Sequence, residues 1–216
     1  MPDSQLSTPE PIPEAESTPA AVRKRPKPGE RRVQILQALA TMLEQPGPER
    51  ITTAALAGRL EVSEAALYRH FASKAQMFEG LIEFIEQSVF TLVNQIIERE
   101  STGSAQAAKV ITMLLQFAEK NPGMTRVMVG DALVFENDRL QQRMNQFFDK
   151  IEATLRQSLR GIGSSELDGS ATPSSDAQVT ASMLTSFVVG RLQRFARSGF
   201  RRLPSEHLEA SLAHML

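Results

Sequence analysis

The sequence lacks several features that mark common classes of protein. It has no cysteine, no tryptophan and one tyrosine among 216 residues. Without cysteine the chain can form neither a disulfide scaffold nor a thiolate for catalysis or metal binding. Its three histidines, at positions 70, 207 and 214, show no metal-ligand spacing with carboxylates or with one another. The sequence also contains no glycine-rich phosphate loop or nucleophile elbow, so we expect neither an enzyme nor a bound cofactor or metal.

Long hydrophobic runs are missing too. No apolar stretch approaches the ~20 residues that a membrane-spanning helix needs. The first 22 residues contain five prolines and four acidic residues, where a signal peptide would have an apolar centre. We therefore expect a cytoplasmic protein with no membrane partner.

Charge is unevenly distributed along the chain. The net charge is only −1. Residues 23–74 hold ten Lys and Arg against five Glu, a net charge of +5, whereas residues 75–216 hold 14 against 16 acidic residues, a net charge of −2. A charge run is usually only a solvated face, but a basic N-terminal region also suits nucleic acid as a partner.

The first 28 residues are predicted to be a disordered tail that ends in a basic arm. The composition of residues 1–22 cannot bury enough apolar surface to order itself. The arm that follows contains Arg23, Lys24, Arg25 and Lys27. It is placed to lie along phosphates or to reach into a minor groove, and a solubilising linker explains it equally well.

From Gly29 onward the apolar residues recur at helical spacing, and no segment alternates with the period of a strand. The sequence therefore predicts an all-α fold of about nine helices. We expect Val33 and Leu92 among the inward-facing side chains, and Asp138 as the cap of the seventh helix. After the first three helices, the predicted helical segments are 73–99, 104–120, a short helix before 138, 138–160, 177–197 and 205–216.

The segment Thr52–Phe71, TTAALAGRLEVSEAALYRHF, carries the most specific signal. Its spacing predicts two short helices that cross at a tight turn. Ser63 can cap the second helix, and Glu61 occupies the turn, where glycine is common because it adopts a positive φ easily. Small, aromatic and basic residues on the outer face suit a DNA major groove, although such units also occur as plain packing modules. The inward side chains are predicted to be Leu56, Ala57, Leu60, Val62, Leu67 and Phe71.

A capping box, Ser73-Lys74-Ala75-Gln76, then starts a long helix. The runs ITTAALAGRL, SEAALYRHF and SKAQMF resemble the TetR family of dimeric repressors. The resemblance implies a three-helix, helix-turn-helix DNA-binding domain over 29–74 and a C-terminal helical dimerisation and regulatory domain over 75–216. Two recognition helices related by a two-fold axis would read a palindrome in double-stranded DNA.

The predicted DNA contacts fall into two groups. Side chains and backbone N–H groups near the start of the second helix are expected to hold phosphates, and the start of the third helix is expected to approach base edges. Ser63 lies at this start as the cap. The expected phosphate contacts are Thr52, Thr53, Tyr68, His70 and Lys74, and the expected base contacts are Glu64, Ala65, Ala66 and Arg69.

An apolar stripe on the eighth helix is the predicted dimer interface. Core packing explains such a stripe about as readily as an interface does. The family resemblance favours the interface, because TetR-like proteins dimerise through their last two long helices. The residues are Met183, Leu184, Phe187, Val188, Leu192 and Phe195.

Two hypotheses for function remain. The resemblance extends through RRVQILQALATMLE and GDALVFENDRLQQRMNQFFDKIEATLRQ to the nucleoid occlusion factors within the family. It implies a nucleoid-associated homodimer that binds DNA palindromes, singly or as dimers of dimers, and that binds the tubulin-like protein FtsZ and antagonises Z-ring assembly. The alternative is a transcriptional repressor released by a small molecule that enters the helical body.

The FtsZ hypothesis requires an exposed groove for an extended peptide, with an apolar floor and basic flanks. By resemblance this groove lies between the fourth and fifth helices. Leu92 stands where a basic residue is expected and Gln116 where glycine is expected, so the peptide contact would be rearranged or weaker here. Core packing would account for Phe84 and Met113 equally well. The candidate groove residues are Phe84, Gln87, Leu92, Met113, Gln116, Lys120 and Asn121.

Overall fold

A computed structural model describes residues 29–45, 51–160 and 173–216. Within these ranges the chain forms nine α-helices and a short 3-10 helix, η1, with no strand, so the predicted all-α class is confirmed. The predicted tail and basic arm lie outside the described residues, as does most of the segment 161–175, which is rich in glycine and serine and is predicted to be a loop. The helices are α1 (Glu30–Leu43), α2 (Thr53–Arg59), α3 (Glu64–Tyr68), α4 (Lys74–Arg99), α5 (Gly103–Lys120), α6 (Pro122–Met128), η1 (Asp131–Leu133), α7 (Asp138–Leu159), α8 (Pro173–Arg197) and α9 (Leu208–Met215).

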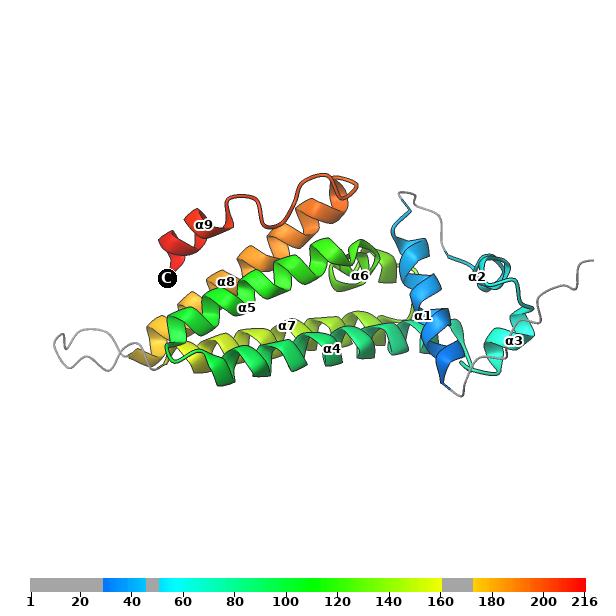
Figure 1. Ribbon diagram of the computed structural model, residues 1–216, viewed down its shortest axis with the longest axis horizontal. Coiled ribbons are helices and arrows are strands. Elements are labelled where there is room, and N and C mark those ends of the chain that lie inside the picture. Colours follow the sequence, from blue (N-terminus) through cyan, green and yellow to red (C-terminus); the bar gives the residue numbers. More distant parts are fainter. Residues whose placement is uncertain (1–28, 46–50, 161–172) are drawn as a thin grey trace, which may run out of the picture.

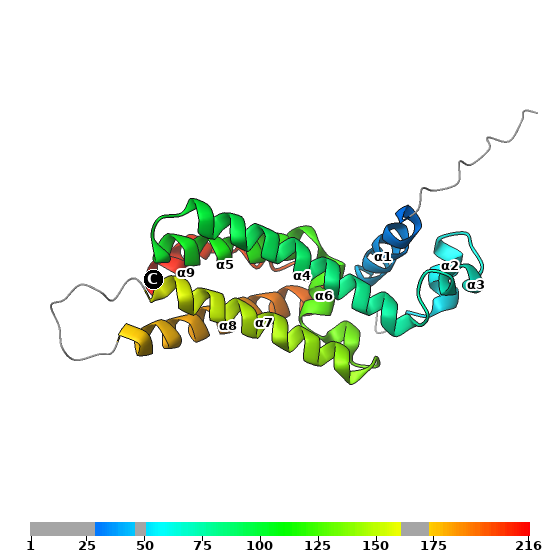
Figure 2. The same cartoon turned by 90° about the horizontal axis from the view of Figure 1, so that it is seen from below.

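The helices form a small unit, α1–α3, at one end of an elongated body (Figure 1). Helix α4 starts beside the small unit and runs along the body, where α5 and α7 pack against it. Helix α8 packs on α7 and α5, and α6 lies between the body and α1. Figure 2 shows the same division from a second direction, with α3 at the end of the molecule opposite the C-terminus.

Side-chain caps set the starts of several helices, as the sequence predicts for α3 and α4. The Ser63 hydroxyl accepts a hydrogen bond from the Ala66 N–H at 3.3 Å, and the Ser73 hydroxyl accepts one from the Gln76 N–H at 3.2 Å. The predicted cap at Asp138 is wrong, because Asn137 caps α7 by accepting the Arg139 N–H at 3.0 Å. Asn and Asp are equally good caps, so residue type alone did not distinguish the two neighbours.

The apolar core runs through the small unit and the body. The predicted inward residues of the helix-turn-helix are buried or partly buried and pack together. Two other predictions were wrong: Val33 is 51% exposed and Leu92 is 39% exposed. In α1 the core face passes through Ile35 and Leu39 instead, and in α4 it ends at Val93. Neighbouring helical residues point about 100° apart, so a shift of one position changes the face.

Helix α6 joins the small unit to the body through close contacts. A Cβ atom on Gly123 would lie 1.9 Å from the carbonyl oxygen of Ala40 in α1. Arg126 then donates to the carbonyl oxygens of Leu43, the last residue of α1, and of Gln45 just beyond it, at 3.3 and 3.4 Å. These contacts fix how α1 sits on the body.

We expect Gly123→Ala to lower the free energy of unfolding by about 1–3 kcal/mol, because the added methyl group overpacks the α1–α6 contact. Gly58→Ala is the matched control, since a Cβ atom there meets nothing within 4 Å. It should stabilise α2 by about 0.5–1 kcal/mol. Urea unfolding measures both changes, and equal effects of the two substitutions would contradict the proposed close contact.

Glu61 has a φ of 53° at the turn between α2 and α3, which confirms the positive φ expected there. A non-glycine residue in this region costs on the order of 1 kcal/mol. Glu61→Gly should therefore raise the free energy of unfolding by about 0.5–1 kcal/mol. Glu61→Ala removes the carboxylate but keeps the Cβ atom, so it should give no such gain in the same urea titration. If the two variants have the same free energy of unfolding, the backbone at this turn is not strained.

Candidate DNA-binding and partner-binding surfaces

The crossing of α2 and α3 places two predicted contact residues side by side. The Val62 N–H donates to the Ala57 carbonyl at 3.0 Å, which closes the turn. Across this turn the Thr53 hydroxyl donates to the Glu64 carboxylate at 2.5 Å. The first turn of α2 is therefore linked to the first turn of α3.

The outer face of α3 is exposed at the end of the molecule (Figures 1 and 2). Tyr68, at the end of α3, is 46% exposed, and Ala66 is half-buried. The Thr52 hydroxyl caps α2 by accepting the Ala55 N–H at 3.1 Å. Most of the predicted DNA contacts thus lie on one free surface: Thr52, Ser63, Glu64, Ala65, Tyr68, Arg69 and His70 are exposed.

Lys74, a predicted phosphate contact, is held by the body. Its Nζ lies 2.5 Å from the Glu136 carboxylate, and the two side chains are only 18% and 7% exposed. The Lys74 ammonium would have to leave this ion pair to reach a phosphate. The pairing joins residues 62 positions apart, so sequence spacing gave no signal for it.

Arg32 supports the residues that follow α3. Apolar spacing in the sequence does not indicate this role. The Arg32 Nη1 donates to the His70 carbonyl at 2.9 Å. Its guanidinium carbon lies 4.1 Å from the centre of the Phe71 ring. Arg32 therefore ties α1 to the residues that follow α3.

The seven candidate groove residues lie on or beside α4 and α5, which pack side by side. Phe84 and Leu92 on α4 are 46% and 39% exposed, so neither fills the core. Met113 is partly buried, and Asn121 donates its side-chain N–H to the Phe117 carbonyl at 2.7 Å. Gln87, Gln116 and Lys120 are exposed.

Most of the apolar stripe of α8 that was predicted as the dimer interface is buried in the core of the protomer. Leu184, Val188, Leu192 and Phe195 are at most 2% exposed, so they pack within the protomer and are not free for a partner. Phe187 is half-buried beneath the Arg191 guanidinium, 4.8 Å from its ring centre. Met183 is 53% exposed. The exposed side of α8 also carries Val179, Ser186 and Gly190.

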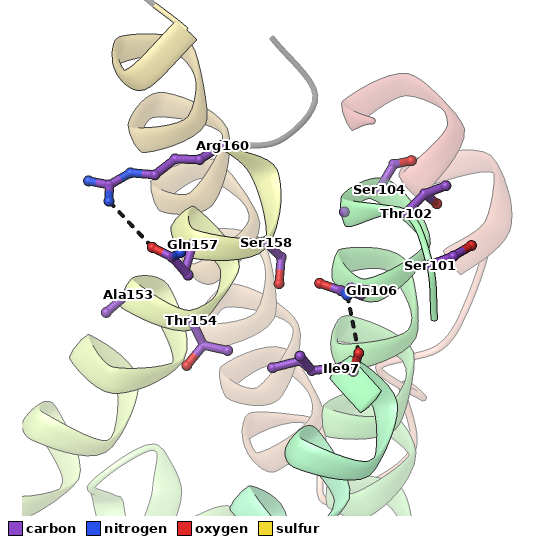
Figure 3. Close-up of a pocket in the computed structure, with 11 residues that line it drawn as sticks. Ile97, Ser101, Thr102, Ser104, Gln106, Ala153, Thr154, Gln157, Ser158 and Arg160 are labelled. Atoms are coloured by element: carbon purple, nitrogen blue, oxygen red, sulfur yellow. Dashed lines mark hydrogen bonds between the residues drawn. The ribbon is translucent and has the colours of Figure 1, made fainter. Parts of the chain in front are cut away.

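A cleft lies between the end of α4, the start of α5 and the end of α7 (Figure 3). Gln106 donates to the carbonyl oxygens of Ile97 and Glu100, at 3.2 and 2.8 Å. Arg160 donates to Gln157 at 3.3 Å. Most of the lining residues have polar side chains, but their apolar atoms form the larger part of the lining surface: Ile97, Ser101, Thr102, Gly103, Ser104, Gln106, Ala153, Thr154, Gln157, Ser158 and Arg160.

In the part of the chain that the structure describes, no cluster of three or more His, Asp or Glu side chains is arranged to hold a metal ion. No helix in the same residues is both long and apolar enough to cross a membrane.

Comparisons with known proteins match both parts of the chain. Residues 35–81 match the model for bacterial regulatory proteins of the tetR family, and residues 104–216 match the SlmA-like model described as a tetracyclin repressor-like C-terminal domain. The chain is also similar in fold to FadR from Bacillus subtilis, solved with stearoyl-CoA. That likeness has a TM-score of 0.66 at 16% identity and covers 85% of this chain and 96% of FadR.

Two curated relatives share about half of their residues with this chain. It is 50% identical to the nucleoid occlusion factor SlmA of Idiomarina loihiensis over 180 residues, 83% of this chain and 90% of the relative. It is 52% identical to the SlmA of Photobacterium profundum, with the same coverage. With a DNA-binding model matched at its start and these relatives spanning most of its length, the chain belongs to the SlmA family of nucleoid occlusion factors, DNA-binding regulators within the TetR family.

Proposed function

We propose that this protein binds palindromic DNA as a dimer, associates with the nucleoid, binds FtsZ and antagonises Z-ring assembly there. Division would then be coordinated with chromosome segregation. The observation that carries the proposal is the roughly 50% identity to curated nucleoid occlusion factors across 83% of the chain. Identity of this extent includes both the helix-turn-helix and the helical body.

Residues 29–74 would serve as the DNA-binding domain and 75–216 as the dimerisation and partner-binding domain. The exposed face of α3 would enter a major groove, with Ala65, Ala66 and Arg69 near base edges. The Thr53 hydroxyl donates a hydrogen bond to the Glu64 carboxylate in the free protein. This hydrogen bond would break when the Thr53 hydroxyl donates to a DNA phosphate instead. The remaining proposed contacts are Thr52, Ser63, Tyr68, His70 and Lys74.

Dimerisation would use the exposed side of α8 and leave its inner stripe in the core. Val179 and Met183 are 56% and 53% exposed, and they lie four residues apart, on one face of the helix. Ser186 and Gly190 continue this face and are small enough for a partner helix to approach closely. Of the six residues predicted from the sequence, Met183 and Phe187 remain available to a partner.

FtsZ would bind the outer face of α4 and α5. Two large apolar side chains, Phe84 and Leu92, are exposed there, and such side chains beside polar neighbours suit a peptide-binding surface. Gln87, Gln116 and Lys120 would surround them. Met113 would form part of the floor, and Asn121 would close one end.

The ligand-responsive alternative receives little support from the cleft at the ends of α4 and α7. A site for a drug-sized ligand buries most of its occupant's surface. The cleft is open to solvent and lies at the end of the body far from α1–α3 (Figures 1 and 2). The stearoyl-CoA bound by the FadR structure concerns that protein, because 16% identity relates the two by fold alone.

Binding to DNA tests the two groups of proposed contacts. Thr53→Ala should weaken binding to all sequences alike, by about two- to twelvefold, because the lost hydrogen bond is worth about 0.5–1.5 kcal/mol. Thr154→Ala, on α7, is a matched control and should bind normally. Ala65→Leu should instead reduce discrimination between random DNA and a chromosomal fragment selected by its affinity for the protein, by about tenfold.

Fluorescence anisotropy with both DNAs measures these effects. Unchanged affinity for Thr53→Ala would remove Thr53 from the interface. If Ala65→Leu loses equal affinity for both DNAs, Ala65 does not approach the bases. Binding of the unmodified protein should also weaken steeply with salt, because neutralised phosphates release counterions.

Light scattering of FtsZ with GTP tests the partner. Polymer should be lost when the protein is added with its selected DNA fragments, and retained with random DNA. Phe84→Ala should bind DNA normally and need at least tenfold more protein for the same effect, as for a central interface residue. Phe135→Ala is the matched control, because Phe135 is 68% exposed on a different segment.

Intact FtsZ polymer despite tight binding of the selected DNA would argue against division inhibition and favour a ligand-responsive repressor. Equal potency of Phe84→Ala and Phe135→Ala would move the FtsZ site away from α4.

A further inference from the structure

The last third of the body contains a long stretch without acidic residues. Residues 177–205 include five arginines and neither Asp nor Glu. Two of these, Arg201 and Arg202, lie on the coil 198–205 between α8 and α9, which we call the basic strap. Both are exposed. Exposed arginines attract an anionic partner, and the first exposed acidic side chain after them is Glu206, directly beyond the basic strap.

Hydrogen bonds hold the backbone of the basic strap in a defined turn. The Ser198 hydroxyl accepts the N–H groups of Arg201 and Arg202, at 3.1 and 2.9 Å, and donates to the Phe195 carbonyl at 2.9 Å. The Phe200 ring packs edge-on against Phe195, with centroids 5.2 Å apart. The positions of the two arginines on the surface are therefore set by the turn. The Arg201 Nε also donates to the Ser198 carbonyl at 2.9 Å, which leaves its two terminal guanidinium nitrogens for a partner.

The turn is also strained. Among the described residues only Glu61, Phe200 and His207 are non-glycine residues with positive φ, and the last two, at 63° and 54°, lie within or just after the basic strap. Each such residue costs about 1 kcal/mol or more. Strain of this kind persists only where the surrounding contacts impose it, and it is often found at functional segments.

The basic strap is fastened to the end of α5. The Ser205 N–H donates to the Glu119 carboxylate at 2.9 Å, and Pro204 is buried. Glu119 precedes Lys120, one of the proposed FtsZ contacts. In Figure 1, α4, α5 and the coil that leads to α9 follow one another across the body, while α3 lies at the far end.

We infer that the basic strap binds the acidic part of the peptide whose apolar part occupies the α4–α5 face. The inference rests on the proposed function and concerns how that same partner is recognised. Of the seven proposed groove residues only Lys120 is charged, so the groove by itself has little to offer an acidic peptide. Arg201 and Arg202 supply two guanidinium groups, which pair with carboxylates in a two-pronged geometry.

An acidic peptide fits these observations better than DNA does. Helix α3 lies at one end of the molecule, whereas the basic strap leaves α8 beside α6, with α1 between the two (Figures 1 and 2), so DNA bound to α3 would have to extend past α1 to reach the strap. The strap instead continues the proposed FtsZ surface across the end of α5, through the Ser205 and Glu119 contact.

The test is fluorescence anisotropy of a labelled peptide with the acidic tail sequence of FtsZ, titrated with the full-length protein on its selected DNA. The double variant Arg201→Gln/Arg202→Gln should bind the peptide about fivefold more weakly at low salt, as expected for two exposed ion pairs. Arg139→Gln/Arg160→Gln removes two exposed arginines, one on α7 and one directly after it, and should bind like the unmodified protein. Arg201→Lys/Arg202→Lys should recover most of the affinity.

A second peptide, with its acidic residues replaced by amides, separates charge pairing from folding effects. Its affinity should be the same for the unmodified protein and the Gln double variant, because the interaction that distinguishes them is gone. Equal binding of the acidic peptide by the strap variant and the α7 control would overturn the inference while leaving the proposed function intact. Loss of DNA affinity in the strap variant, with peptide binding unchanged, would identify nucleic acid as the partner. Failure of the unmodified protein to bind the peptide would overturn both.

Discussion

The contact between α1 and α6 is the constraint on which the arrangement of this protein depends. The backbone of α6 approaches that of α1 so closely at Gly123 that a side chain has no room. Arg126 adds hydrogen bonds at and just beyond the end of α1. Helices α2 and α3 pack on α1 or on each other, and α1 also packs on α4, so the orientation of the recognition helix relative to the body is set through the contacts of α1 with α6 and α4.

Ion pairs hold α4 from its inner side and leave its outer side free. Lys74 pairs with Glu136 at the start of α4. Further along, Arg143 of α7 donates to both carboxylate oxygens of Glu86, at 3.1 and 2.6 Å, and this hydrogen bonding raises the pKa of the already strongly basic Arg143. Because these ion pairs hold α4 in place, the exposed Phe84 and Leu92 lie on a helix whose position is fixed.

Local patterns were predicted well because they depend on neighbours in the sequence. The crossing at Glu61 and the caps at Ser63 and Ser73 each depend on a few consecutive residues. Val33, Leu92 and Asp138 were assigned wrongly because spacing gives the period of a helix but leaves the boundary of the buried face, or of the helix, uncertain by one position. Such an error turns a side chain by about 100°, enough to move it from core to solvent.

The sequence by itself determined the all-helical class, the helix-turn-helix and the membership of the TetR family, since short-range capping, spacing and motif residues suffice for these. Only the tertiary structure decided which side of the α8 stripe is core, that Lys74 pairs with Glu136, that Arg32 supports the end of α3 and that the basic strap lies against α5. These features join residues 38 to 86 positions apart or depend on which helix packs where. No local pattern encodes that choice, because it follows from the burial of all the helices together.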